Sequence, residues 1–124
     1  MVPKLSSYEE FWPYYVSEHM EPVTRRLHVL GTTLVLAALA AAVLVDPLWF
    51  IAAPLFGYGF AWVGHFFFEH NRPATFTYPL WSLRADFRMF RLTLLGRMGP
   101  ELQRARALFP RREAVGASSS AALP

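Results

Sequence analysis

The fold is decided by the stretch LHVLGTTLVLAALAAAVLV, residues 27–45, together with its neighbour LWFIAAPLFGYGFAWVGHFFF, residues 48–68. Neither stretch contains Asp, Glu, Lys or Arg, and each is close to the ~20 residues that a helix needs to cross a ~30 Å hydrocarbon layer. Only Asp46 and Pro47 separate them, a pair typical of a helix start, which predicts a tight turn. We therefore expect an all-α membrane protein built on an antiparallel transmembrane helical hairpin; a helical hairpin buried in a soluble protein is the alternative.

The charges of the chain lie outside these two stretches. The 124 residues include 12 Lys and Arg, with a formal net charge of +3, and every basic residue precedes position 27 or follows position 71. Because a hairpin brings both outer ends to one side, the positive-inside rule predicts that both termini are cytoplasmic. The lipid bilayer is the expected partner, and no nucleic-acid partner is predicted. The absence of cysteine excludes disulfides, iron–sulfur clusters and thiolate zinc sites.

Two shorter helices are predicted beside the hairpin, both amphipathic and both at the membrane interface. Residues 7–20 begin with a Ser…Glu capping pattern and are rich in aromatic side chains. Residues 82–98 carry Leu and Phe on one helical face and several arginines on another, too many charges for a third crossing. We expect residues 1–110 to form a single membrane domain and the polar tail 111–124 to be disordered.

The histidines gather at the end of the hairpin that lies away from the turn. His28 lies eighteen residues before Asp46, and His65 lies eighteen residues after Pro47. At 1.5 Å per residue both are about 27 Å from the turn and thus at equal depth. Small residues share their helix faces: Gly31, Ala38 and Ala42 on the first span, and Ala53, Gly57 and Ala61 on the second. Such residues let membrane helices approach closely, so the two imidazoles are predicted to face one crevice.

Other polar side chains join this end. His19 precedes the bend predicted at Pro22, His70 follows the second span, and Glu69 lies one turn after His65. Imidazole and carboxylate ligands without sulfur fit Fe(II), Zn or Mn. The pattern predicts a metal site formed by His19, His28, His65 and His70, with Glu69 as an additional candidate. A lone interfacial histidine is often only a polar anchor, but four on one side favour a site.

Arg25 and Arg26 occupy the first turn of the first span, where the helix dipole disfavours cations. One interpretation is that they and the helix N-terminus bind an anion such as a fatty-acid carboxylate or a lipid phosphate. The alternative is that they only set the topology.

Two motifs resemble a known family. HMEP (residues 19–22) followed by RLH (26–28), and GYGFAWVGHFFFEHNRPATF (57–76), are similar to a family of small membrane proteins once listed only as a domain of unknown function. Its fungal member is a 2-hydroxy fatty acid dioxygenase of the endoplasmic reticulum, and the resemblance covers about residues 8–98. It implies Fe(II)-dependent α-oxidation, in which a 2-hydroxy fatty acid reacts with O2 and becomes a fatty acid one carbon shorter.

The resemblance also implies roles for individual residues. His19, His28 and His65 match the family's important histidines, whereas position 70 varies more. Arg25 or Arg26 would orient the substrate carboxylate, and Asn71 belongs to the motif as a further substrate-binding candidate. The short chain resembles bacterial members, which implies the bacterial inner membrane, or the endoplasmic reticulum in a eukaryote.

Two other functions remain open at the level of sequence. His28 and His65 at equal depth would suit a bis-histidine haem in an electron carrier. A non-enzymatic membrane scaffold or lipid-binding protein is the other alternative. Because two spans shelter a reactive site poorly, a homo-oligomer is a further expectation.

Overall fold

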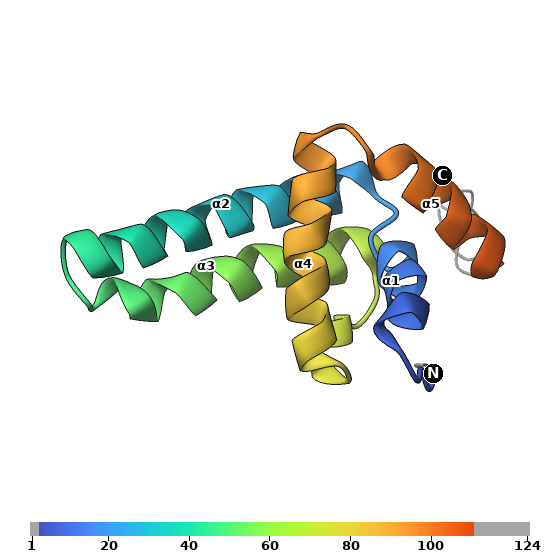
Figure 1. The fold of residues 1–124 in the computed structure, drawn as a ribbon, viewed down its shortest axis with the longest axis horizontal. Coiled ribbons are helices and arrows are strands. Elements are labelled where there is room, and N and C mark those ends of the chain that lie inside the picture. Colours follow the sequence, from blue (N-terminus) through green and yellow to red (C-terminus); the bar gives the residue numbers. More distant parts are fainter. Residues whose placement is uncertain (1–2, 111–124) are drawn as a thin grey trace.

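The computed structural model of the chain describes residues 3–110, and every element in that range is a helix (Figure 1). The elements are α1 (Tyr8–Ser17), α2 (Pro22–Leu44), α3 (Trp49–Val63), the π-helix η1 (Gly64–Glu69), the short 3-10 helix η2 (Ala74–Phe76), α4 (Pro79–Leu94) and α5 (Met98–Leu108). The predicted all-α class is confirmed. The expected disorder of the tail concerns residues 111–124, which lie outside the described range.

Helices α2 and α3 lie side by side along their lengths (Figure 1). Small residues allow the close approach, because a Cβ atom added to Gly31 would lie 3.1 Å from the carbonyl oxygen of Phe56. A Cβ added to Gly57 would lie 3.1 Å from a methyl carbon of Val35. The two helices therefore come close at Gly31 and at Gly57. At the turn, the backbone N–H of Leu48 donates to the Asp46 carboxylate at 2.9 Å, and α3 begins one residue later.

The outer surface of this pair is apolar. Two helical stretches, Pro22–Leu44 and Trp49–Glu69, are long and apolar enough to cross a membrane. Only 28% and 17% of their most apolar windows are buried inside the protein. The core helix of a soluble protein would be mostly covered, so these exposed apolar side chains indicate membrane association.

Helix α1, which the sequence analysis predicted as an interfacial helix, has its side chains buried against other helices of the protein. Its capping is as predicted, since the Ser7 hydroxyl accepts a hydrogen bond from the backbone N–H of Glu10. Its aromatic side chains are buried all round, with Phe11, Trp12 and Tyr15 at most 1% exposed. They pack against α4 and α5, and the indole N–H of Trp12 donates to Glu101 of α5 at 2.8 Å. The aromatic side chains of α1 therefore form the core of the protein.

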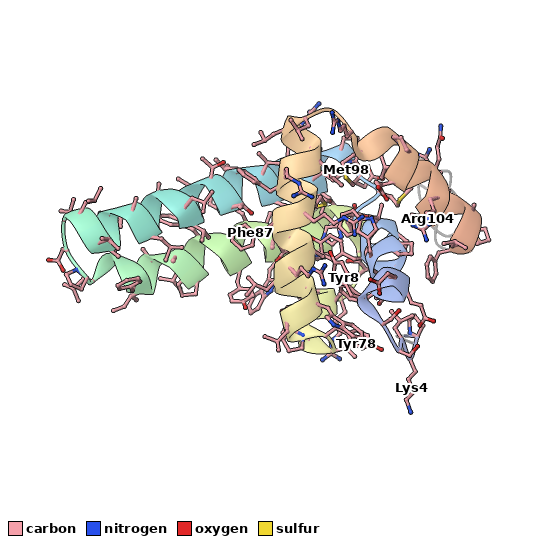
Figure 2. All side chains as sticks on the ribbon, viewed as in Figure 1. Lys4, Tyr8, Tyr78, Phe87, Met98 and Arg104 are labelled. Carbon is pink, nitrogen blue, oxygen red and sulfur yellow. The ribbon has the colours of Figure 1, made fainter. Side chains whose placement is uncertain are left out.

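Helix α4 crosses the α2–α3 pair close to its histidine end (Figure 1). It ends at Leu94 rather than at the expected position 98, because Gly96 adopts a φ of 67°, a left-handed conformation that breaks the helix. Helix α5 then covers α1 and was not predicted. Tyr8 of α1 faces α4, whose Arg84 guanidinium lies 3.9 Å from the ring centroid (Figure 2).

Candidate metal centre

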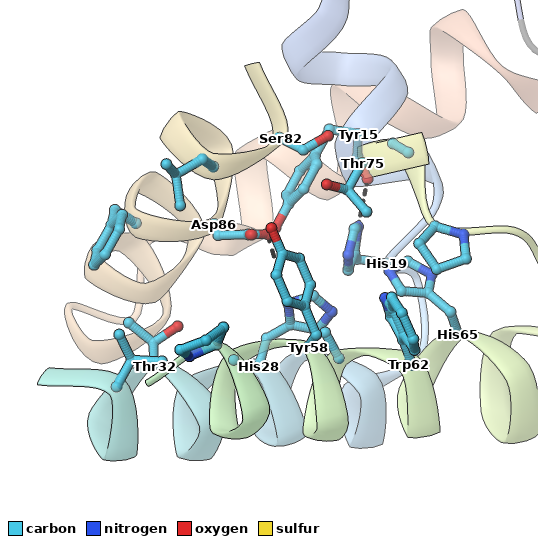
Figure 3. Close-up of a pocket in the computed structure, with 18 of the residues that line it drawn as sticks. Tyr15, His19, His28, Thr32, Tyr58, Trp62, His65, Thr75, Ser82 and Asp86 are labelled. Carbon is cyan, nitrogen blue, oxygen red and sulfur yellow. Dashed lines mark hydrogen bonds and ion pairs between the residues drawn. The ribbon is translucent and has the colours of Figure 1, made fainter. Parts of the chain in front are cut away.

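Three of the four histidines meet at the end of the hairpin where α1, α2 and η1 converge. Their ring centroids are 4.5 Å apart for His19 and His28, 4.5 Å for His19 and His65, and 5.4 Å for His28 and His65. All three side chains are buried, and one ligand nitrogen from each lies within 4.8 Å of the other two. Figure 3 shows the rings grouped around one space below Tyr15 and Asp86.

Oxygen acceptors lie behind the three rings. The Nδ1 atom of His19 is 2.6 Å from the backbone carbonyl of Tyr15, and Nδ1 of His65 is 2.6 Å from the amide oxygen of Asn71. Because these acceptors carry no proton, each Nδ1 must donate one, which leaves the lone pair on Nε2. The Nδ1 atom of His28 lies 3.7 Å from the Asp86 carboxylate.

The other ring nitrogens are the ones available to an ion. The Nε2 atoms of His19 and His28 are buried and have no hydrogen-bond partner among residues 3–110. Buried polar atoms are rarely left unpaired unless a ligand or ion completes them. Three neutral imidazoles, two of them held by hydrogen bonds through Nδ1, therefore fit a transition-metal ion, because the ligands of histidine metal sites are commonly held in this way.

The π-helix η1 determines how His65 enters the cluster. Its wider turn changes the direction of the side chains that follow α3, as π-helical segments at functional sites commonly do. Gly64 lets η1 approach α2, because a Cβ atom there would lie 2.8 Å from the Thr24 methyl group. His70 ends the segment with a φ of 55° in the left-handed region. Sequence periodicity did not predict this π-helix.

The remaining predicted ligands lie elsewhere. His70 is exposed, and the group of candidate ligands found in the described residues contains only the three buried histidines. The carboxylate of Glu69 accepts a hydrogen bond from the backbone N–H of Glu21 at 2.6 Å, so it caps the start of α2 instead of joining His65. The structure therefore does not bring His70 or Glu69 into the cluster.

The predicted substrate-binding residues lie around the three histidines, and none of them lines the cavity that opens beside the cluster. The Arg25 guanidinium donates to the backbone carbonyls of His19 and Met20, at 2.8 Å each. Arg26 is exposed. The Asn71 side chain uses both its polar atoms, since its amide N–H₂ donates to the Glu18 carbonyl at 3.0 Å while its oxygen contacts His65. Arg25 and Asn71 thus hold the segments that carry the histidines.

Comparison with known proteins agrees with this geometry. Residues 5–98 match the family described as 2-hydroxy-palmitic acid dioxygenase Mpo1-like. The chain belongs to the Mpo1-like family. The matched range includes all three clustered histidines, and the family's description names a dioxygenase and a 2-hydroxy fatty acid. Neither the curated proteins nor the solved structures gave a match.

Two residues of this Mpo1-like site were missed in the sequence. The Tyr15 hydroxyl donates a hydrogen bond to the Asp86 carboxylate, and the Tyr15 ring stacks on His19 with centroids 4.1 Å apart. Burial raises the pKa of Asp86 to about 7, an effect that the hydrogen bond from Tyr15 partly offsets. The pKa of His19 is lowered well below its usual value, first by burial and then by His65 and His28. Asp86 is the only acidic residue in α4, and this is the feature by which the sequence could have marked it as a site residue.

A cavity of about 220 Å³ opens beside the histidines of the Mpo1-like site. One wall is α3, the opposite wall is α2, and residues of α4 cover it (Figure 3). Hydroxyl groups of Thr75 and Ser82 line the part near Tyr15, and Ser82 Oγ is buried without a partner among the described residues. The remainder is largely apolar, so the cavity can accept a molecule with a polar head and an alkyl tail.

Proposed function

We propose that this chain is an Fe(II)-dependent dioxygenase that converts 2-hydroxy fatty acids into fatty acids one carbon shorter. The proposal is carried by three buried histidines, two of them held by hydrogen bonds through Nδ1, beside a largely apolar cavity in a member of the Mpo1-like family. Non-haem iron centres combine a few protein ligands with open positions for substrate and O2. When bound there, Fe(II) would supply the redox chemistry for the reaction with O2.

In this proposal the side chains have distinct tasks. His19, His28 and His65 hold the ion, while the Tyr15 carbonyl, Asn71 and Asp86 orient their rings. The buried Ser82 hydroxyl and its neighbour Thr75 donate hydrogen bonds to the carboxylate or hydroxyl of the substrate, because both line the cavity beside the cluster. The apolar walls exclude bulk water from the reacting end.

The overall reaction balances without an external reductant. A 2-hydroxy acid, RCH(OH)COOH, and O2 contain the same atoms as RCOOH, CO2 and H2O. The bond between the carboxyl carbon and the hydroxyl-bearing carbon breaks, that second carbon is oxidised to a carboxyl group, and O2 accepts the electrons. The substrates are thus a 2-hydroxy fatty acid and O2 alone.

The distribution of basic residues determines the membrane orientation that we propose. We propose that α2 and the α3–η1 helix cross the bilayer and that the histidine end faces the cytoplasm, since the basic residues gather at that end. An acyl chain can then remain in an apolar environment while its polar head reaches the histidines.

The haem alternative is disfavoured by the third histidine. A porphyrin bound between His28 and His65 needs the space between their rings, but His19 lies 4.5 Å from both. A scaffold without enzymatic activity would give the buried Nε2 atoms no ligand.

The test is turnover by purified protein reconstituted with Fe(II). Wild-type protein should convert 2-hydroxyhexadecanoic acid into pentadecanoic acid in the presence of O2. His19→Ala, His28→Ala and His65→Ala should each lose activity by at least about 10²-fold, while His70→Ala, at an exposed position, should retain it. Absence of O2-dependent shortening in the reconstituted wild type would refute the proposed function.

A further inference from the structure

We propose that the α2–α3 groove is a track for the acyl chain and that Ala53 marks its far end. The inference rests on the proposed function, and it assigns a binding site to the part of the substrate that the histidines do not touch. The cavity beside the cluster continues along α3 through Ala61, Gly57 and Ala53, which lie at successive intervals of four residues from His65. Residues four apart lie on one helix face, so these form a continuous floor.

The walls of the track are apolar side chains of the neighbouring helices. Val35 and the methyl-bearing Thr32 line it from α2, and Leu83 and Phe87 line it from α4. Tyr58 of α3 also lines the cavity, and Figure 3 shows its ring beside His28. An alkyl chain is the ligand that such a lining favours.

The length of the track corresponds to a long fatty acid. From His65 to Ala53 the helix advances by twelve residues, which is about 18 Å at 1.5 Å per residue. An extended alkyl chain advances about 1.3 Å per carbon, given C–C bonds of ~1.5 Å in a zigzag. About 14 carbons therefore fit beyond the hydroxyl-bearing carbon, for a total of about 16. The family's description names 2-hydroxy-palmitic acid, which has that length.

The groove closes beyond this point. Ala38 and Ala42 of α2 are buried, whereas the cavity lining on α2 extends only to Val35. The two helices are therefore packed together between the end of the cavity and the turn. An acyl chain that lies along the floor would therefore end where α2 and α3 close together.

Chain-length dependence tests the track. 2-Hydroxydecanoic acid should end about 10 Å from the hydroxyl-bearing carbon, well before Ala53, whereas 2-hydroxyhexadecanoic acid should reach it. A phenyl ring in Ala53→Phe would displace two or more methylenes, each worth about fourfold in affinity. We expect the preference for the 16-carbon over the 10-carbon acid, as a ratio of kcat/KM, to fall at least about tenfold.

The control is Leu55→Phe, which adds a ring at an exposed position of α3 that does not line the cavity, and it should leave the ratio within about twofold. Ala53→Leu is a smaller substitution for the case that Ala53→Phe does not fold. Ala61→Phe, only about 6 Å from His65, should weaken both acids. Equilibrium binding of the same acids under argon provides a second readout without turnover.

An unchanged ratio in both Ala53 variants would overturn the track. Failure of the wild type to turn over either acid would instead refute the proposed function. In that case the binding ratio under argon would still decide whether Ala53 marks the end of an acyl site.

Discussion

The hydrogen bond between Asn71 and His65 offers a direct test of how the centre is held. Asn71→Leu removes the acceptor 2.6 Å from His65 Nδ1 and the donor 3.0 Å from the Glu18 carbonyl, at nearly unchanged side-chain size. Loss of such an outer partner usually lowers metal affinity by about 10- to 100-fold, which is about 1.4–2.7 kcal/mol. The unpaired groups left behind should also lower the free energy of unfolding by about 1–3 kcal/mol.

Asn71→Asp is the matched control because it keeps an oxygen acceptor for Nδ1 while a carboxylate oxygen replaces the amide donor. Fe(II) affinity, measured by competition with a chromophoric chelator, should fall in Asn71→Leu and stay near the wild-type value in Asn71→Asp. Thermal unfolding in detergent, measured without metal, separates the stability loss from the affinity loss. Wild-type affinity in Asn71→Leu would show that His65 does not depend on this hydrogen bond for binding the ion.

Two further substitutions test the scaffold around the cluster. Arg25→Met removes two charge-assisted hydrogen bonds to the backbone and should lower the free energy of unfolding by about 2 kcal/mol. Arg26→Met, at an exposed site, should change it by no more than ~0.5 kcal/mol. Equal effects of the two variants on the melting temperature would refute the role of Arg25 in holding the backbone. Gly64→Ala places a Cβ atom 2.8 Å from a methyl carbon of α2 and should cost about 1–3 kcal/mol and weaken Fe(II) binding. Gly59→Ala meets no atom within 4 Å and should be neutral in the same unfolding and titration measurements, so a neutral Gly64→Ala would contradict the close approach of η1 and α2.

The hairpin and the pairing of His28 with His65 could be predicted because both follow from one-dimensional rules. Uncharged length indicates a spanning helix, and distance from the turn gives equal depth in two antiparallel helices. The small residues Gly31 and Gly57 predicted a close approach of the two helices, and in the structure both glycines lie where the neighbouring helix comes close.

The other features of the site depend on tertiary contacts, which the periodicity of the sequence does not predict. The aromatic residues of α1 suggested an amphipathic helix, but their burial against α4 and α5 depends on the tertiary packing. Glu69 was expected to point with His65, but in the π-helix it turns to the backbone of Glu21. Asp86 joins the site because α4 crosses the hairpin, an arrangement that the spacing of its side chains leaves open.

Iron stoichiometry is the most direct measurement of the central claim. Metal analysis of detergent-purified protein after reconstitution should find about one Fe(II) per chain in the wild type and in His70→Ala. The His19→Ala, His28→Ala and His65→Ala variants should each lose the ion while remaining folded. Retention of iron in all three variants, or its absence from the folded wild type, would contradict a centre built from these histidines.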